Sequence, residues 1–119
     1  MRHPGLFEFI KNEDQFKDII SKTDIYPSLG IYGADRGQKH FLMSALGFFT
    51  CSPLLVITSK EEKARAVLQD MSVFFPPNRV DYFPVREIVP METYAQSREV
   101  VSQRVEIMDK ILHGKAQCV

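Results

Sequence analysis

The sequence predicts one α/β domain of three layers, with helices on both faces of a mostly parallel sheet. Short apolar runs that end in glycine or proline alternate with helical patterns, which is typical of βαβ units. The chain has 119 residues and 45% of them are hydrophobic. At this size a single core is expected and a second domain is not. We therefore predict that residues 1–119 form one domain.

Four segments have the composition of strands. Residues 28–33, 54–58 and 80–83 are apolar runs that stop at glycine, serine or proline, and such runs are typical of buried strands. Residues 116–119 begin like a fourth strand. A domain rarely ends inside a core strand. We therefore expect the chain to be a fragment of a longer protein.

Four segments have helical periodicity: residues 12–22, 39–49, 59–75 and 97–112. Ser59 and Glu62 have the spacing of a capping box, which predicts the start of the third helix. Gly114 is expected to close the last helix in the left-handed conformation. The inward face of that helix is predicted to be Val101, Val105, Met108, Ile111 and Leu112.

Composition also limits function and location. Fifteen Lys and Arg residues balance fifteen Asp and Glu residues, whereas binding DNA by phosphate neutralisation alone needs an excess of cations. No apolar run approaches the length of a membrane span, and the first residues do not resemble a signal peptide. We expect a cytoplasmic protein without a membrane segment, in which Cys51 and Cys118 are reduced.

The loop after residue 32 is the place where an α/β nucleotide fold would bind phosphates. A Walker A loop needs a second glycine for close phosphate approach, then a lysine, then a hydroxyl that ligates magnesium. Here Lys39 is in register, but Gln38 replaces the glycine and His40 replaces the hydroxyl. The degenerate loop comprises Gly33, Gly37, Gln38, Lys39 and His40. We predict a structural turn with no nucleotide; the alternative is a working P-loop ATPase or helicase domain that binds ATP through Lys39.

Other candidate sites have weaker support. His3, His40 and His113 are scattered, so we expect surface histidines rather than catalysts, and no metal site. A possible partner or DNA surface is carried by four arginines among aromatic residues. Neighbouring glutamates offset this charge, which favours a protein contact or a solvated surface over an independent DNA-binding module. The four residues are Arg79, Arg86, Arg98 and Arg104.

Several motifs together resemble a known family. They are Leu29 to Gly33, Pro53 to Thr58, Tyr82-Phe83-Pro84, Pro90-Met91-Glu92, Ser97-x-Glu99, Arg104 and Leu112-x-Gly114. This series is similar to the N-terminal domain of the bacterial transcription-repair coupling factors, the Mfd family. The resemblance runs from about residue 15 onward.

The resemblance implies a fold like the first domain of the excision-repair protein UvrB, with a helicase-like architecture that has lost its nucleotide loop. It implies a non-catalytic scaffold, without a cofactor of its own, in a protein that displaces RNA polymerase stalled at DNA lesions. The implied partners are UvrA, through an adjoining second domain, RNA polymerase, double-stranded DNA and other domains of the same chain. ATP and magnesium would act in distant motor domains.

Overall fold

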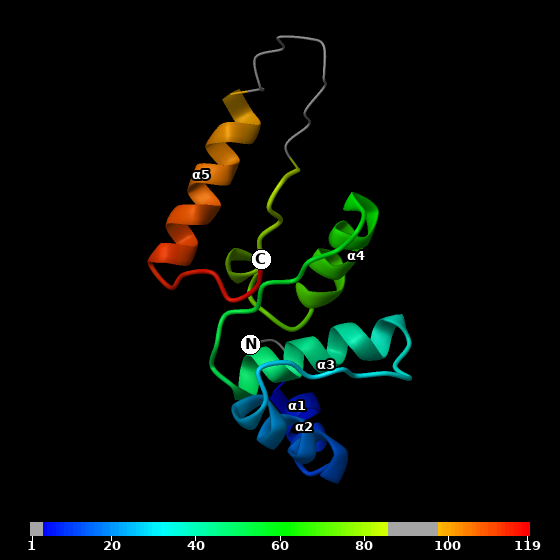
Figure 1. Cartoon of the computed structure of the whole chain (residues 1–119). Helices are drawn as coiled ribbons and strands as arrows, with labels where there is room; N and C mark the ends of the chain where they lie inside the picture. Colours follow the sequence, from blue (N-terminus) through cyan, green and yellow to red (C-terminus); the bar gives the residue numbers. More distant parts are fainter. Residues whose placement is uncertain (1–3, 86–97) are drawn as a thin grey trace.

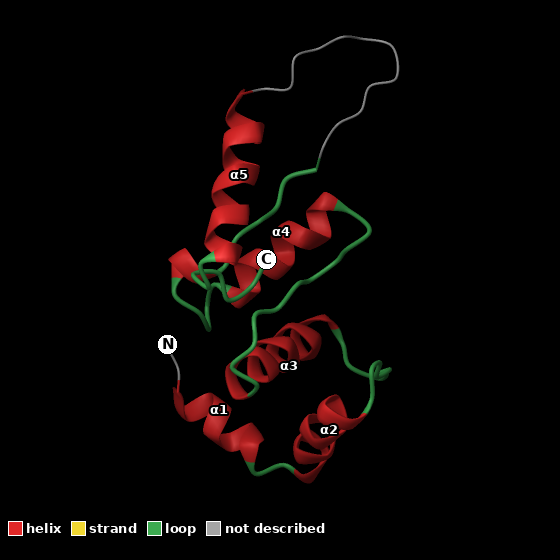
Figure 2. Ribbon diagram, turned by 60° about the vertical axis from the view of Figure 1, so that its left-hand side comes forward, coloured by secondary structure: helices red, strands yellow, loops and turns green. Residues whose placement is uncertain are grey.

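A computed structural model describes residues 4–85 and 98–119, and these residues form a helical, elongated molecule (Figure 1). Its principal extents are 54 × 27 × 25 Å. The described helices are α1 (Pro4–Lys11), α2 (Asp14–Ile25), α3 (Arg36–Phe49), α4 (Glu61–Met71), the 3-10 helix η1 (Pro77–Arg79) and α5 (Arg98–Leu112). The first three α-helices lie together at one end, and α5 extends away at the other (Figures 1 and 2).

The predicted three-layer α/β fold is wrong, because the described residues contain helices and no strand (Figure 2). Two isolated parallel bridges, Leu54 to Cys118 and Val80 to Cys118, are found where strands were predicted. Residues 28–33 form neither a strand nor a bridge, and Tyr32 is 93% exposed. A strand requires a ladder of paired backbone groups, and short apolar runs alone do not specify one.

Helix prediction was more successful. The segments expected to be helical correspond to α2, α3, α4 and α5, with ends that differ by a few residues. The capping box predicted at Ser59 is wrong, because the N-cap of α4 is Lys60 and makes no side-chain cap bond. Gly114 has φ of +64°, which confirms the predicted left-handed turn after α5. Helix α1 was not predicted.

A phenylalanine-rich core joins α1 and α2 to α3. Phe7 is 1% exposed, and its ring stacks on Phe48 with centroids 5.2 Å apart. Phe16 and Ala45 are buried in the same cluster, and Phe74, beyond α4, packs against it. Aromatic side chains bury large apolar areas, so this cluster fixes the three N-terminal helices to one another.

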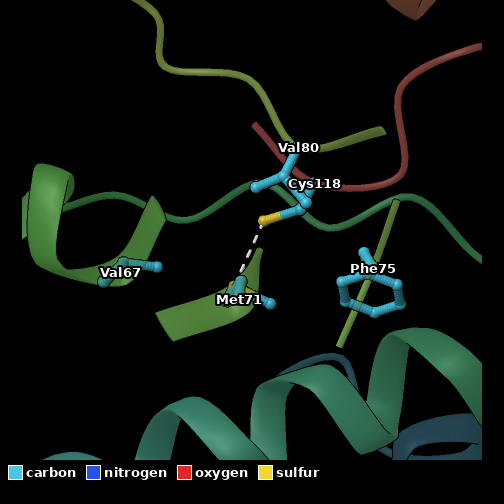
Figure 3. Close-up of a cluster of buried hydrophobic side chains, with 5 residues drawn as sticks. All are labelled: Val67, Met71, Phe75, Val80 and Cys118. Atoms are coloured by element: carbon cyan, nitrogen blue, oxygen red, sulfur yellow. Dashed lines mark hydrogen bonds between the residues drawn. The ribbon is translucent and has the colours of Figure 1, made fainter. Parts of the chain in front are cut away.

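A second core lies under the parallel bridges (Figure 3) and comprises Val67, Met71, Phe75, Val80 and Cys118. The Cys118 thiol donates to the sulfur of Met71 at 3.4 Å. Burial raises the pKa of Cys118 to about 11, because an apolar environment disfavours the thiolate. Cys118 and the exposed Cys51 are both free thiols, as predicted.

The predicted inward face of α5 is wrong. Val105 is 60% exposed and Leu112 is 83% exposed, whereas Ile107 is the buried residue of this helix. Periodicity identifies one apolar face but not the surface that covers it. None of the helices in the described parts of the chain is both long and apolar enough to cross a membrane.

Polar contacts hold α5 to the extended segment that follows η1. Lys110 Nζ lies 2.8 Å from Asp81 Oδ1 and 3.3 Å from Glu106 Oε1. The hydrogen bond to Asp81, followed by the attraction of the two carboxylates, raises the pKa of Lys110 although burial opposes the shift. The second carboxylate oxygen of Asp81 is buried and has no hydrogen-bond partner among the described residues. The ion pair between α5 and Asp81 therefore depends on the Lys110 ammonium group.

Candidate functional site

The start of α3 is closed by its own side chains. Asp35 is the N-cap, and its carboxylate accepts a hydrogen bond of 3.0 Å from the Gln38 amide. The Gln38 side-chain oxygen accepts one of 3.0 Å from the Asp35 amide. The partial positive charge of a helix N-terminus attracts anions, and here a carboxylate of the chain already occupies that position.

Lys39 does not line the same hollow as the loop that precedes it. Gly33, Ala34 and Gln38 line a hollow between α2 and α3. Lys39 lines a cleft on another side of α3, between α3 and α4. A Walker A lysine must meet the phosphates that its own loop encloses, so this arrangement separates the two parts of the motif.

The two glycines of the loop have different structural roles. Gly33 has φ of +89°, a conformation that residues with a side chain rarely adopt. Gly37 lies in the first turn of α3, where an added Cβ would make only an ordinary contact of 3.9 Å with the Asp35 carboxylate. Gly33 is therefore required by the local backbone, and Gly37 is not.

His40 joins two helices and is not a surface residue, contrary to our prediction. It is 8% exposed, and its Nδ1 lies 2.5 Å from Oδ2 of Asp70 near the end of α4. Its backbone carbonyl accepts a hydrogen bond from the Ser44 hydroxyl. Where a Walker A loop has a magnesium ligand, this chain has a contact that fixes α3 against α4.

The predicted arginine surface is dispersed as far as it is described. Arg98 begins α5, whereas Arg79 lines a hollow with Ile111 and Gly114 at the other end of that helix. A 15-residue helix is about 22 Å long, so these two arginines are well separated. Arg86 lies outside the described residues.

Arg104 has intramolecular partners. Its guanidinium donates a 2.6 Å hydrogen bond to the Pro84 carbonyl and lies 4.2 Å from the centroid of the Phe83 ring. Arg65 makes a similar contact with Tyr82, at 5.0 Å. The rings of Tyr82 and Phe83, which lie among the predicted arginines, therefore contact cations of the same chain.

Asp35 and Asp70 help to build this region, and neither role was predicted from the sequence. Asp35 and Gln38 have the spacing of a capping box, so that signal was present, although we considered Gln38 only as an obstacle to phosphate. Asp70 lies 30 positions from His40, and no local pattern connects the two. Among the described residues, no three His, Cys, Asp or Glu side chains are grouped as a metal site would require.

The geometry defines a helical domain in which the N-terminus of α3 is capped by the side chains of Asp35 and Gln38. Comparison with curated proteins then confirms the predicted resemblance to transcription-repair coupling factors. The chain is 28% identical to that of Bacillus subtilis (strain 168) over an alignment of 114 residues, and the match covers 93% of this chain and 10% of the relative. It is 26% identical over 86 residues to that of Rickettsia bellii (strain RML369-C), covering 66% of this chain and 8% of the relative.

The chain therefore matches a fragment of transcription-repair coupling factor and spans about a tenth of the length of these relatives. No family model matches the chain. No solved structure matches it either.

Proposed function

We propose that this chain is a non-catalytic scaffold within a transcription-repair coupling factor. The observation that carries the proposal is the reciprocal bonding of Asp35 and Gln38, which uses two loop amides and places a carboxylate at the start of α3. A phosphate at this position would meet like charge and would have to displace both side chains. The position of Lys39 in a separate cleft supports the same proposal.

The scaffold would serve a protein that displaces RNA polymerase stalled at DNA lesions and recruits the excision machinery. We propose that UvrA binds through an adjoining domain, that double-stranded DNA and RNA polymerase are engaged elsewhere in the full protein, and that ATP and magnesium act in distant motor domains. This protein would act in the bacterial cytoplasm. The similarity to two transcription-repair coupling factors supports this assignment.

The alternative is a domain that binds ATP through Lys39. Lys39 is exposed in the first part of α3 and has no ion-pair partner among the described residues. The Lys39 ammonium group is therefore accessible to an anion. The scaffold function and the ATP-binding function are separated by measuring nucleotide binding.

A thermal-shift titration with magnesium-ATP and magnesium-ADP separates them. A ligand that binds only the folded state raises stability by about 2.7 kcal/mol at one hundred times its Kd, a readily measured shift for a domain of this size. The scaffold proposal predicts no saturable shift in the unmodified chain or in Lys39→Ala. A saturable shift that disappears in Lys39→Ala but persists in the exposed control Lys17→Ala would establish the ATP-binding alternative.

A further inference from the structure

We propose that the cleft between α3 and α4 binds an acidic protein segment that also carries apolar side chains. This inference rests on the proposed scaffold function, since it gives the scaffold a kind of partner. The cleft has a volume of about 610 Å³. It is lined by Arg36, Lys39, His40 and Met43 of α3, residues 56–58, and Glu62, Lys63, Ala66 and Val67 of α4.

One face of α3 supplies one wall of the cleft. Arg36, Lys39 and Met43 follow one another at helical spacing, so their side chains project from the same side of the helix. Lys63 and Val67 of α4 have the corresponding spacing of four residues on the opposite wall. The cleft therefore combines cationic and apolar groups on both walls.

The charge of the cleft favours an anionic ligand. Arg36, Lys39 and Lys63 are exposed, and none has an ion-pair partner among the residues that the structure describes. Glu62 is the carboxylate among the lining residues. Some exposed cations elsewhere are paired with neighbouring carboxylates, for example Lys22 with Asp18. The cleft therefore keeps a local positive excess on a chain with no formal net charge.

The apolar lining of the cleft distinguishes a peptide from a nucleic acid. Met43, Val56 and Val67 are apolar and partly or fully buried, and the adjoining Ile57 is 86% exposed. Phosphate backbones bind to broad basic surfaces, whereas this cleft has three cations beside apolar side chains. Protein interfaces combine an apolar centre with a charged rim, and complementary charges guide association. An acidic segment with apolar residues satisfies both features.

The cleft is preorganised. The contact between His40 and Asp70 joins its two walls, and the Asp35 cap fixes the start of α3. A surface that is rigid before binding loses less conformational entropy on association. The cleft can therefore bind a short segment without rearranging the helices.

The test is fluorescence polarisation with a short synthetic peptide that contains Glu and Leu residues, each repeated at the spacing of a helical turn. The matched peptide has Gln in place of each Glu. The whole chain is expected to bind the Glu peptide saturably, more tightly than the Gln peptide and with an affinity that falls as salt rises. The triple variant Arg36→Glu, Lys39→Glu, Lys63→Glu should weaken binding about tenfold or more.

The control is Lys11→Glu, Lys17→Glu, Lys115→Glu, which changes the charge by the same amount outside the cleft and should retain the affinity. Circular dichroism and thermal melting show whether each variant is folded; if the cleft variant unfolds, the single change Lys63→Gln replaces it and should also weaken binding. The proposal is overturned by equal loss in the control, by equal binding of the two peptides, by no saturable binding, or by stronger binding of duplex DNA. If the peptide does not bind, the proposed scaffold function is unaffected. If the chain binds ATP and Lys39→Ala abolishes that binding, the proposed scaffold function is itself contradicted.

Discussion

The two ends of the molecule are stabilised in different ways. At the N-terminal end, α1, α2 and α3 share an aromatic core in which Phe7 is 1% exposed. At the other end, Lys110 and Arg104 of α5 make polar contacts with the neighbouring segment, Ile107 is its buried residue, and Leu112 is 83% exposed. Burial of apolar area is the larger stabilising term. The stability of the N-terminal end should therefore depend mainly on apolar packing, and the stability of the α5 end should depend more on charged contacts.

The largest effect should come from Phe7→Ala. This change removes a fully buried ring from the aromatic core and should lower the free energy of unfolding by about 3 to 5 kcal/mol. Urea denaturation followed by circular dichroism measures the change. The exposed Phe9→Ala, on the same helix and 69% exposed, is the matched control and should have little effect. Equal losses would show that α1 does not dock as described.

The next effect should be a loss of stability between about pH 9 and pH 11. Cys118 has a raised pKa of about 11, against an ordinary value of 9.0. The folded state therefore retains a proton that the unfolded state has lost, and stability falls as pH rises through this range. Two pKa units correspond to roughly 3 kcal/mol. Urea denaturation at a series of pH values should show this fall, and the part below about pH 10.5 should be absent in Cys118→Ala.

Lys110 adds to the base sensitivity of the α5 end at higher pH. Its pKa is raised above 10.5 by Asp81, so its contribution is complete below that value and is lost as pH rises through the raised pKa. Lys110→Met should therefore reduce the fall in stability that remains above about pH 10.5. A fall of unchanged size in this variant would contradict the role given to the contact.

A smaller effect is expected at the start of α3. Asp35→Ala removes an N-cap that forms a complete capping box and should cost about 1 kcal/mol. Asp35→Asn retains an accepting oxygen and is the matched control, with a smaller loss. Chemical denaturation compares the two variants. Equal stability of Asp35→Ala and the unmodified chain would show that the cap bond is not formed.

The smallest effect should come from Leu112→Gln, because that side chain is 83% exposed. Exposed positions without specific contacts usually change stability by less than about 0.5 kcal/mol. A loss comparable to that of Phe7→Ala, measured in the same urea experiment, would mean that the apolar face of α5 is covered in solution. The contrast between the two ends would then disappear.

Helices were predictable because their signals are local. The periodicity of α3 and α4 and the left-handed Gly114 follow from residues a few positions apart. The sheet was not predictable, because the pairing of Cys118 with Leu54 and Val80 depends on distant partners and extends over only single bridges. The prediction that this face of α5 is buried failed for a similar reason, since helical periodicity does not specify which surface packs against the helix.

The candidate site shows the same division. The sequence correctly indicated that Gln38 and His40 depart from a Walker A loop. The reciprocal bonds between Asp35 and Gln38 could have been predicted from their spacing. The partnership of His40 with Asp70 could not, because it depends on how α3 packs against α4.

The central claim is that the start of α3 is closed to phosphate by its own side chains. The most direct test is a ¹H–¹⁵N nuclear magnetic resonance titration that follows the backbone amides of Asp35 and Gln38 as magnesium-ADP is added. We predict that these two resonances do not shift, and that the Gln38 resonance does shift in Asp35→Ala even without nucleotide, because the Gln38 amide loses its acceptor. Saturable shifts of both amides on addition of nucleotide to the unmodified chain would contradict the claim.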